Sequence, residues 1–475
     1  MIIAVLLFAP LVLAAITFML KSEKAGKFLL VTGALIHAAS VVMLWGNPSA
    51  WDLTATISLR ADDEGILLLT VTSTLFFFCS LYLCSWFKVD AERSGGHTGM
   101  KQYTFVSFLL IFLFTMSFTA VAQDLGMLWV AVEATTLASA PLINYHKGKG
   151  SLEAMWKYLL ICSIGIGLAL FGTMLIAASL SDPHGSLDFD YLYFALQEIS
   201  SGGLIWFKAG FVLCFAGYAL KMGLAPFHTW LPDAHSEAPA PVSALLSGSL
   251  LNCAFLAIVR LLAITPDGLL DFGFGYLKFF GFFSLAVAAF FIIRQKDFKR
   301  MLAYSSVEHM GLIALLAAYD QPVFAVIHVF SHSLIKMTLF VVAGNILLAY
   351  GTRSVSDVHG LFKKSPVNAA LWVFGILLIC GTPPSPLFFT ELYLVRTAGV
   401  IPGAVILFLL LMIFAGMTHA ALKMCAPDGK FSSVIEVDKK VEKLATVPVI
   451  TAALITITGV WMLGGMWYYG GGWMK

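Results

Sequence analysis

The sequence predicts an all-α polytopic membrane protein with about 14 transmembrane helices. Hydrophobic residues make up 59% of the 475 positions and charged residues only 12%, whereas a soluble domain carries about 25% charged residues. The chain also contains many continuous apolar runs of about 20 residues, the length that a helix needs to cross a bilayer. These runs lack the polar–apolar alternation of barrel strands, so we expect helices as the spanning elements.

The apolar runs define the candidate spans in chain order. Their predicted bounds are 2–20, 28–46, 65–87, 103–121, 124–143, 154–180, 204–223, 240–263, 274–293, 301–318, 322–349, 368–390, 401–423 and 446–468. The basic residues Lys21, Lys24 and Lys27 follow the first run instead of preceding it. A cleaved signal peptide has its charge first, so we expect a retained first span.

Basic residues gather in alternate loops between these spans, and the intervening loops are neutral or acidic apart from Arg60 and Arg396. The basic loops contain Lys21/Lys24/Lys27, Lys88/Arg93/Lys101, Lys147/Lys149, Arg294/Lys296/Lys299/Arg300, Arg353/Lys363/Lys364 and Lys430/Lys439/Lys440/Lys443. The positive-inside rule therefore predicts cytoplasmic basic loops and both termini on the outer face of a prokaryotic inner membrane. One inner loop, 225–239, is rich in Pro, His and acidic residues instead, which makes it a candidate working part.

Two predicted spans are interrupted. Gly223 and Pro226 interrupt the seventh span, and prolines at 383, 384 and 386 interrupt the twelfth. These spans lie five apart, which predicts two inverted five-helix repeats, helices 4–8 and 9–13, each broken in its fourth helix. Interrupted helices at matching places in inverted halves indicate an ion path.

The span pattern also predicts a domain organisation. We expect a three-helix N-terminal segment over 1–100, a first five-helix repeat over 101–265, a second inverted repeat over 266–425, and a C-terminal loop and last helix over 426–475.

The cysteines give no sign of a cofactor. Seven cysteines lie mostly within or at the ends of apolar runs, and none forms a Cys-x-x-Cys pair or a Cys/His ligand spacing. They are expected to be small buried hydrophobic residues. We therefore expect no metal, iron–sulfur cluster or c-type haem in this chain.

Ionisable side chains at membrane depth are rare and by default functional. Five such residues are expected to form a proton relay: Glu133, Lys221, His332, Lys336 and Glu391. Seven more are candidate relay or entry positions: His228, Asp233, His235, Asn252, Glu308, His309 and His328.

The eleventh span carries the strongest spacing signal. His328, His332 and Lys336 are four residues apart, which places them on one helix face. A metal site is disfavoured, because no Glu follows the first His and no third ligand is evident. Histidine titrates near neutral pH, so a polar stripe that carries protons is the preferred interpretation.

At these residues the chain resembles the antiporter-like subunits shared by respiratory complex I, Mrp-type cation/proton antiporters and group 4 membrane-bound hydrogenases. The most specific motif is Lys221–His235 (KMGLAPFHTWLPDAH). Within this superfamily the chain is most similar to hydrogenase-4 component F. Four stretches carry that similarity: Val132–Thr136, Ser151–Tyr158, Ser236–Leu246 and Tyr304–Gly311.

The resemblance implies fourteen helices, two inverted repeats and a proton path at mid-membrane. It implies that Glu133 and Lys221 are partners, that His332 and Lys336 belong to a polar eleventh helix, and that Glu391 lies near the exit. One position departs from many complex I members, which carry a lysine where this chain has Asn252. An amide cannot carry the proton as a cation, which leaves the middle of the relay open.

We expect a proton-translocating subunit of a redox-driven complex, with nickel–iron and iron–sulfur centres in partner subunits. In this hypothesis Lys221 keeps its proton while Glu133 is close and releases it toward Lys336 when they part. No nucleophile–base pair is evident, so no active site is expected in this chain. The alternatives are a sodium/proton antiporter subunit of Mrp type, a subunit of an inorganic-carbon uptake complex, and a structural scaffold.

Overall fold

A computed structural model describes residues 2–46, 58–93, 99–180, 182, 185–427 and 438–468, with side chains as far as 462. The described residues are nearly all helical, and outside the helices they form only isolated β-bridges. The predicted fold class is therefore confirmed. The chain divides into two compact units, unit 1 (Met1–Cys84 and His97–Tyr276) and unit 2 (Ser85–Gly96 and Leu277–Lys475).

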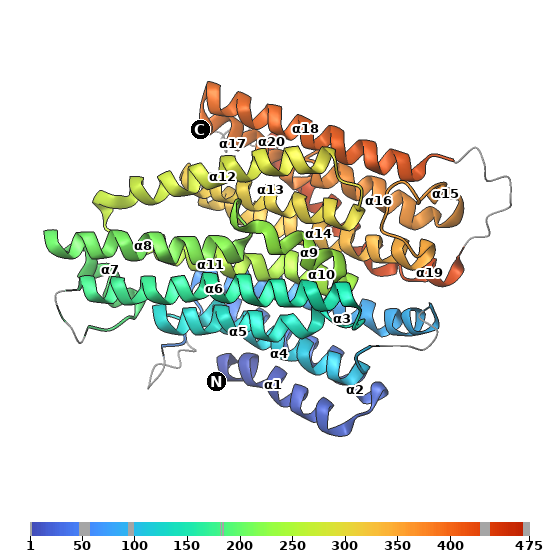
Figure 1. Ribbon diagram of the computed structural model, residues 1–475, viewed down its shortest axis with the longest axis horizontal. Helices are drawn as coiled ribbons and strands as arrows, with labels where there is room; N and C mark the ends of the chain where they lie inside the picture. Colours follow the sequence, from blue (N-terminus) through green and yellow to red (C-terminus); the bar gives the residue numbers. More distant parts are fainter. Residues whose placement is uncertain are drawn as a thin grey trace. The chain divides into compact units, whose positions relative to one another are not determined.

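The helices of unit 1 begin near the N-terminus and end with the first turns of α12 (Figure 1). Their bounds are α1 (Ile2–Leu20), α2 (Glu23–Gly46), α3 (Asp63–Arg93, whose last turns belong to unit 2), α4 (Gln102–Val121), α5 (Leu125–Ile143), α6 (Lys149–Ser179), α7 (Phe189–Gln197), α8 (Ser201–Met222), η2 (Phe227–Thr229), α9 (Trp230–Glu237), α10 (Ala240–Leu245), η3 (Leu246–Leu250), α11 (Leu251–Ala263), η4 (Asp267–Leu269) and α12 (Leu270–Ile293).

Unit 2 holds the rest of α12 and the helices that follow it. Their bounds are α13 (Phe298–Ala318), α14 (Pro322–Tyr350), α15 (Leu361–Lys364), α16 (Pro366–Ile379), α17 (Pro386–Ala398), α18 (Val400–Cys425), α19 (Lys439–Lys443) and α20 (Thr446–Tyr468). Within this unit α14 packs against α13, α16, α17 and α20. The helix with the predicted polar stripe is therefore its central element.

Twelve helical segments of the described residues are long and apolar enough to span a membrane. Two shorter apolar helices, Pro366–Ile379 and Thr446–Met462, correspond to the predicted twelfth and fourteenth spans. The count of fourteen therefore stays a prediction, as do the four segment boundaries and the orientation of the termini.

Close packing of α6 on α8 positions the end of α8. A Cβ at Gly172 would lie 2.6 Å from the carbonyl oxygen of Gly210, and one at Gly210 would lie 2.7 Å from that of Gly172. Two turns further along α8, a Cβ at Gly217 would lie equally close to the backbone of Gly165. Small residues let membrane helices approach to backbone contact, so Lys221 is held close to α5 and α6.

The seventh predicted span is interrupted where the sequence indicates. Helix α8 ends at Met222, and Gly223 follows in the left-handed conformation at φ 82°. The segment 225–239 is not the irregular loop that the hydropathy pattern suggests. It folds into η2 and α9, where Trp230 and Leu231 are buried and the Trp230 indole donates to the carbonyl of Leu220 at 3.0 Å. Because the segment is buried, the bias toward basic loops does not apply to it.

The twelfth predicted span is interrupted in the same way. Helix α16 ends at Ile379, Gly381 has φ 65°, and α17 begins at Pro386. The hydroxyl of Ser385 caps α17 by accepting from the amide of Leu387. Both predicted helix breaks are therefore present.

A π-helical turn, η3, precedes Asn252 in the helix that follows α10. The side-chain amide of Asn252 donates to the carbonyl of Gly248 at 2.6 Å. Single π turns inside longer helices are frequent at functional sites, because they displace side chains and free backbone groups.

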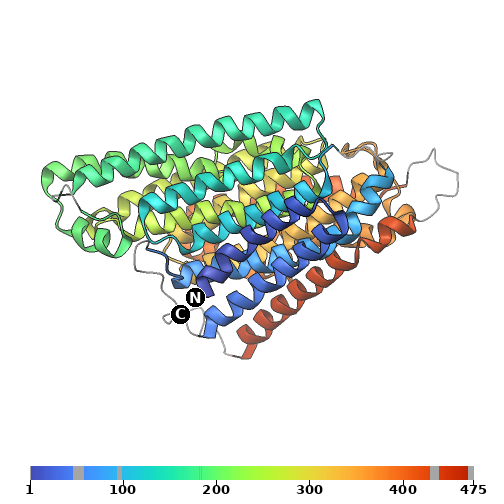
Figure 2. The same ribbon diagram turned by 90° about the horizontal axis from the view of Figure 1, so that it is seen from below.

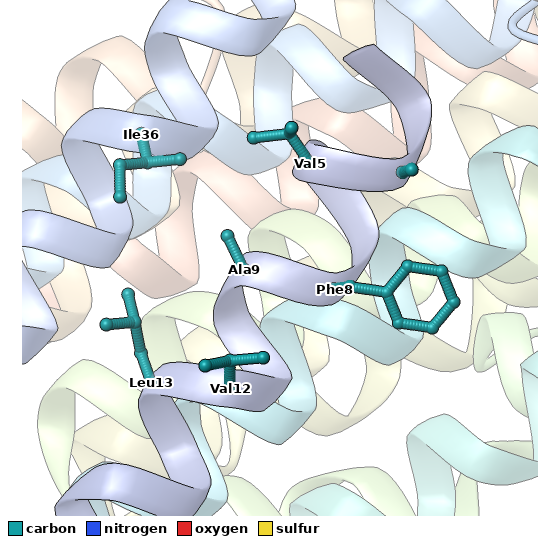
Figure 3. Close-up of a pocket in the computed structure, with 7 residues that line it drawn as sticks. Val5, Phe8, Ala9, Val12, Leu13 and Ile36 are labelled. Atoms are coloured by element: carbon teal, nitrogen blue, oxygen red, sulfur yellow. The ribbon is translucent and has the colours of Figure 1, made fainter. Parts of the chain in front are cut away.

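A hollow in unit 1 lies between α1 and α2, which run side by side (Figures 1 and 2). It has a volume of about 420 Å³ and is lined by Ala4, Val5, Phe8, Ala9, Val12, Leu13 and Ile36 (Figure 3). Its lining is entirely apolar, so it offers no group for binding an ion.

Candidate functional site

Glu133 lies near the middle of α5, at a depth where the bilayer would be apolar. The Ser163 hydroxyl donates to its Oε1 at 2.7 Å, and the Thr136 hydroxyl donates to its Oε2 at 3.3 Å. Its side chain is partly exposed on a surface that includes Val130 and Leu137, which are 44% and 59% exposed. The carboxylate is thus bound on one side and open on the other.

Lys221 lies in the last turn of α8 and is fully buried. Its ammonium group donates to the Thr136 hydroxyl at 2.6 Å and to the Tyr158 hydroxyl at 2.9 Å. The ammonium also lies 4.8 Å from the centroid of the Tyr158 ring, within the range of a cation–π interaction. Two hydroxyl acceptors and an aromatic ring therefore surround the amine of this buried lysine.

Glu133 and Lys221 therefore lie in one hydrogen-bonded network. They are joined through the Thr136 hydroxyl and make no direct ion pair. Sequence reasoning missed this link, because threonine hydroxyls in membrane helices usually bond their own backbone. The Thr-Thr pair in the Val132–Thr136 motif was the available signal.

Three of the candidate entry residues lie on η2 and α9, directly after the break in α8. Asp233 binds Lys157 of α6 at 3.2 Å, and Lys157 also binds Glu153 one turn earlier at 2.6 Å. His228 and His235 are buried in the same segment. Sequence reasoning assigned no role to Lys157, although this residue lies in the Ser151–Tyr158 motif.

In unit 2, Lys336 of α14 is fully buried and bonds α13. Its ammonium group donates to the carbonyl oxygen of Leu302 at 2.6 Å and to the hydroxyl of Ser305. Glu308 lies one turn further along α13 and is 1% exposed. Among the described residues its Oε2 has no hydrogen-bond partner.

A cluster of three histidines extends from α13 to α17. Nδ1 of His309 lies 3.0 Å from Nε2 of His328, and Nδ1 of His328 lies 2.8 Å from the hydroxyl of Thr390. The ring of His332 lies 5.1 Å from that of His309, centroid to centroid. The predicted stripe on α14 is thus joined to α13 and to the residue before Glu391.

Glu391 lies at the break between α16 and α17 and is 8% exposed. Its carboxylate lies against Gly381, where a Cβ would collide with Oε2. The structure therefore groups Glu308, His309, His328, His332, Lys336 and Glu391 in unit 2, and Glu133, Lys221, His228, Asp233, His235 and Asn252 in unit 1.

Metal-binding side chains do not cluster in the part of the chain that the structure covers. No three His, Cys, Asp or Glu residues there are placed to hold an ion. The seven cysteines are all free thiols. The two networks are built from hydroxyls, imidazoles, amines and carboxylates, which are groups that exchange protons.

Residues 122–418 match the family described as NADH:quinone oxidoreductase/Mrp antiporter, transmembrane. A hydrogenase-4 component F homolog from Methylacidiphilum infernorum is 34% identical over 348 residues, which cover 71% of this chain and 72% of the relative.

Two solved structures share the fold. A chain of an archaeal membrane-bound sulfane sulfur reductase is similar with a TM-score of 0.85 and 22% identity, over 97% of this chain and 95% of that one. A chain of the Mrp complex from Dietzia sp. is similar with a TM-score of 0.79 and 19% identity, over 98% and 95%.

Proposed function

The chain belongs to the NADH:quinone oxidoreductase/Mrp antiporter transmembrane family, and we propose that it translocates protons as an antiporter-like subunit of a redox-driven complex. The complex would be a group 4 hydrogenase or a complex I-like enzyme, in a prokaryotic inner membrane. The relay residues are Glu133 and Lys221 in unit 1, and His332, Lys336 and Glu391 in unit 2.

One observation carries this proposal: a fully buried lysine is linked to a carboxylate at mid-membrane depth through a single hydroxyl. Leaving charged groups inside hydrocarbon is unfavourable by several kcal/mol, at about 2.5–3.5 kcal/mol even on insertion scales. A helical bundle that only needs stability has no use for such groups. A chain that hands protons across the membrane needs them.

The proton is taken up near Glu133 and held by Lys221. It then passes to the His332 and Lys336 group and leaves by way of Glu391. His228, Asp233 and His235 line the segment after the break in α8 and serve proton entry from the cytoplasm. Glu308, His309 and His328 extend the second cluster, and Asn252 stands where many relatives carry a cation.

Energy for the transport comes from partner subunits. Moving one charge against 100 mV takes about 2.3 kcal/mol, and the sequence of this chain carries no phosphate-binding loop or cluster ligand set. The similarity to a hydrogenase-4 component F homolog supports a redox enzyme as the partner. Its subunits would hold the nickel–iron and iron–sulfur centres.

The surface around Glu133 also supports the proposal that this chain is one subunit of a larger membrane complex. Its partly exposed carboxylate lies at mid-helix among apolar residues such as Leu137 and Leu160, which are 59% and 58% exposed. Lipid cannot solvate a carboxylate at this depth. A neighbouring membrane subunit that offers a polar group there would satisfy it.

A second candidate function is a sodium/proton antiporter subunit of Mrp type or a subunit of an inorganic-carbon uptake complex. The similarity to a chain of the Mrp complex favours the antiporter. Transport without redox subunits, or transport that requires sodium, would favour it over the pump.

The test is proton flux and redox turnover in proteoliposomes of the whole complex, wild type against Glu133→Gln. We expect the variant to keep redox activity and to lose most of its pumping. Glu198→Gln serves as a control, because Glu198 is an exposed carboxylate after α7, outside both networks. Unchanged pumping in Glu133→Gln would remove the proposed relay.

A further inference from the structure

We propose that the Thr136 hydroxyl carries the proton from Glu133 to Lys221, as the obligatory bridge of the first relay step. This inference rests on the proposed function and adds a residue to it. It concerns an uncharged side chain that neither the hydropathy pattern nor the charge pattern singles out.

The position of the hydroxyl supports this role. Oγ1 of Thr136 lies 2.6 Å from Nζ of Lys221 and 3.3 Å from Oε2 of Glu133, and Thr136 is fully buried. The hydrogen bond with Lys221 is short, and the one with Glu133 is long for two oxygens. Glu133 and Lys221 make no direct ion pair, and this oxygen is hydrogen-bonded to both of them.

The directions of the hydrogen bonds identify the bridge. An ammonium group only donates, so the Thr136 oxygen accepts from Lys221 and its own proton is free to bind Glu133. The other contact of Lys221, Tyr158, differs. Its remaining partner is the Ser139 hydroxyl at 2.7 Å, a contact in which either oxygen can donate.

Tyr158 accepts from Lys221, and its other partner is a serine hydroxyl, which is not a carboxyl group that could supply a proton. Among the two hydroxyls at Nζ, only Thr136 is bonded to a proton source, Glu133. In this proposal Tyr158 binds the lysine amine, and Thr136 transfers the proton to it.

The step balances in protons and charge. The O–H bond of a protonated Glu133 breaks and a new O–H bond forms on Thr136. At the same time the original O–H bond of Thr136 breaks and an N–H bond forms on the neutral Lys221. The products are a carboxylate and an ammonium group, with Thr136 donating to Glu133 and accepting from Lys221. This is the pattern that the structure contains.

The neighbouring residue provides a matched control. Thr135 is equally buried, but its hydroxyl donates only to the carbonyl of Val132 at 2.6 Å. It shares the helix, the residue type and the burial of Thr136, and it lacks the bridge.

The experiment compares proton pumping per redox turnover in proteoliposomes of the whole complex. The variants are Thr136→Val, which keeps the shape and removes the hydroxyl, Thr136→Ser, which keeps the hydroxyl, Thr135→Val and Glu133→Gln. Equal amounts of assembled complex are compared. We expect Thr136→Val to lower pumping about tenfold or more, as for loss of a proton-transfer group, while Thr136→Ser and Thr135→Val stay near wild type.

The outcomes separate this inference from the proposed function. If Glu133→Gln stops pumping and Thr136→Val does not, the bridge is wrong and the relay stands. If Glu133→Gln pumps normally, the relay itself is wrong. If Thr136→Ser loses as much as Thr136→Val, the residue acts through packing and the bridge is overturned.

Discussion

The carboxylate of Glu391 lies directly against the α-carbon of Gly381, inside the break between α16 and α17. Gly381 also has φ 65°, a backbone conformation that side chains disfavour. Two separate physical requirements therefore select glycine at this position. The backbone needs a positive φ, and the Glu391 carboxylate needs the space that a Cβ would fill.

Replacing Gly381 tests the second requirement. We expect Gly381→Ala to displace the Glu391 carboxylate and to lower proton flux several-fold, because the new methyl would collide with Oε2. The positive φ by itself destabilises alanine by about 1–2 kcal/mol. Flux in proteoliposomes and thermal unfolding of the complex measure the two effects.

Gly351→Ala is the matched control for this variant. Gly351 has φ 69°, and a Cβ there meets no atom within 4 Å. It should lower stability to a similar degree and leave flux unchanged. Equal flux in the two variants would show that the contact with Glu391 does not matter.

Thr390 offers a test of the second cluster. Its hydroxyl is the partner of His328 at 2.8 Å and donates to the carbonyl of Leu387. We expect Thr390→Val to lower proton flux, because His328 then loses its partner on α17, and Thr390→Ser to restore most of it. Thr397→Val is the control on the same helix, since that hydroxyl binds only its own backbone. A normal flux in Thr390→Val would contradict a transport role for the His309–His328–Thr390 chain.

Glu442 of α19 fastens the C-terminal region to α16. Its carboxylate accepts from the Ser365 hydroxyl, from the amide of Val367 at 3.2 Å and from the Asn368 amide at 3.4 Å. A carboxylate at a helix N-terminus is stabilising, so Glu442→Gln should destabilise unit 2 by about 1–2 kcal/mol.

Thermal unfolding of the purified protein measures this loss. Glu92→Gln is the control, since Glu92 pairs with Lys440 at a site where the two side chains are 39% and 69% exposed. Such exposed pairs contribute little to stability, because water screens their charges. A larger fall in the unfolding temperature for Glu92→Gln than for Glu442→Gln would contradict the stabilising role of Glu442.

Arg260 of α11 closes the end of α4 in unit 1. Its guanidinium donates to the carbonyls of Thr119, Ala120 and Ala122 at 2.6–3.1 Å and to both oxygens of Asp62. We expect Arg260→Met to lower stability by about 2–3 kcal/mol, because buried carbonyls lose their donor.

The comparison for Arg260 is Arg60→Met, measured by the same unfolding experiment. Arg60 binds Asp190 with side-chain exposures of 39% and 63%. An exposed pair of this kind should contribute less than about 1 kcal/mol. If both variants lose a similar amount of stability, the burial of Arg260 does not increase its contribution.

Both helix breaks were predictable from the chain alone. Gly223 and Pro226, like the prolines at 383, 384 and 386, act on the backbone within a few residues, so their effect depends little on the rest of the fold. The segment 225–239 was not predictable in the same way. Its polar residues indicated a loop, but Trp230 and Leu231 pack into unit 1 and turn it into buried helix.

The sequence by itself determined that this protein is a bundle of membrane helices with two interruptions and with ionisable residues at depth, because hydropathy and proline act locally. The tertiary structure decided which groups connect. Thr136 between Glu133 and Lys221, and Thr390 beside His328, are common residues whose meaning lies in distances near 3 Å. Such distances depend on how closely helices pack, as at Gly172 and Gly210, and no spacing along the chain encodes them.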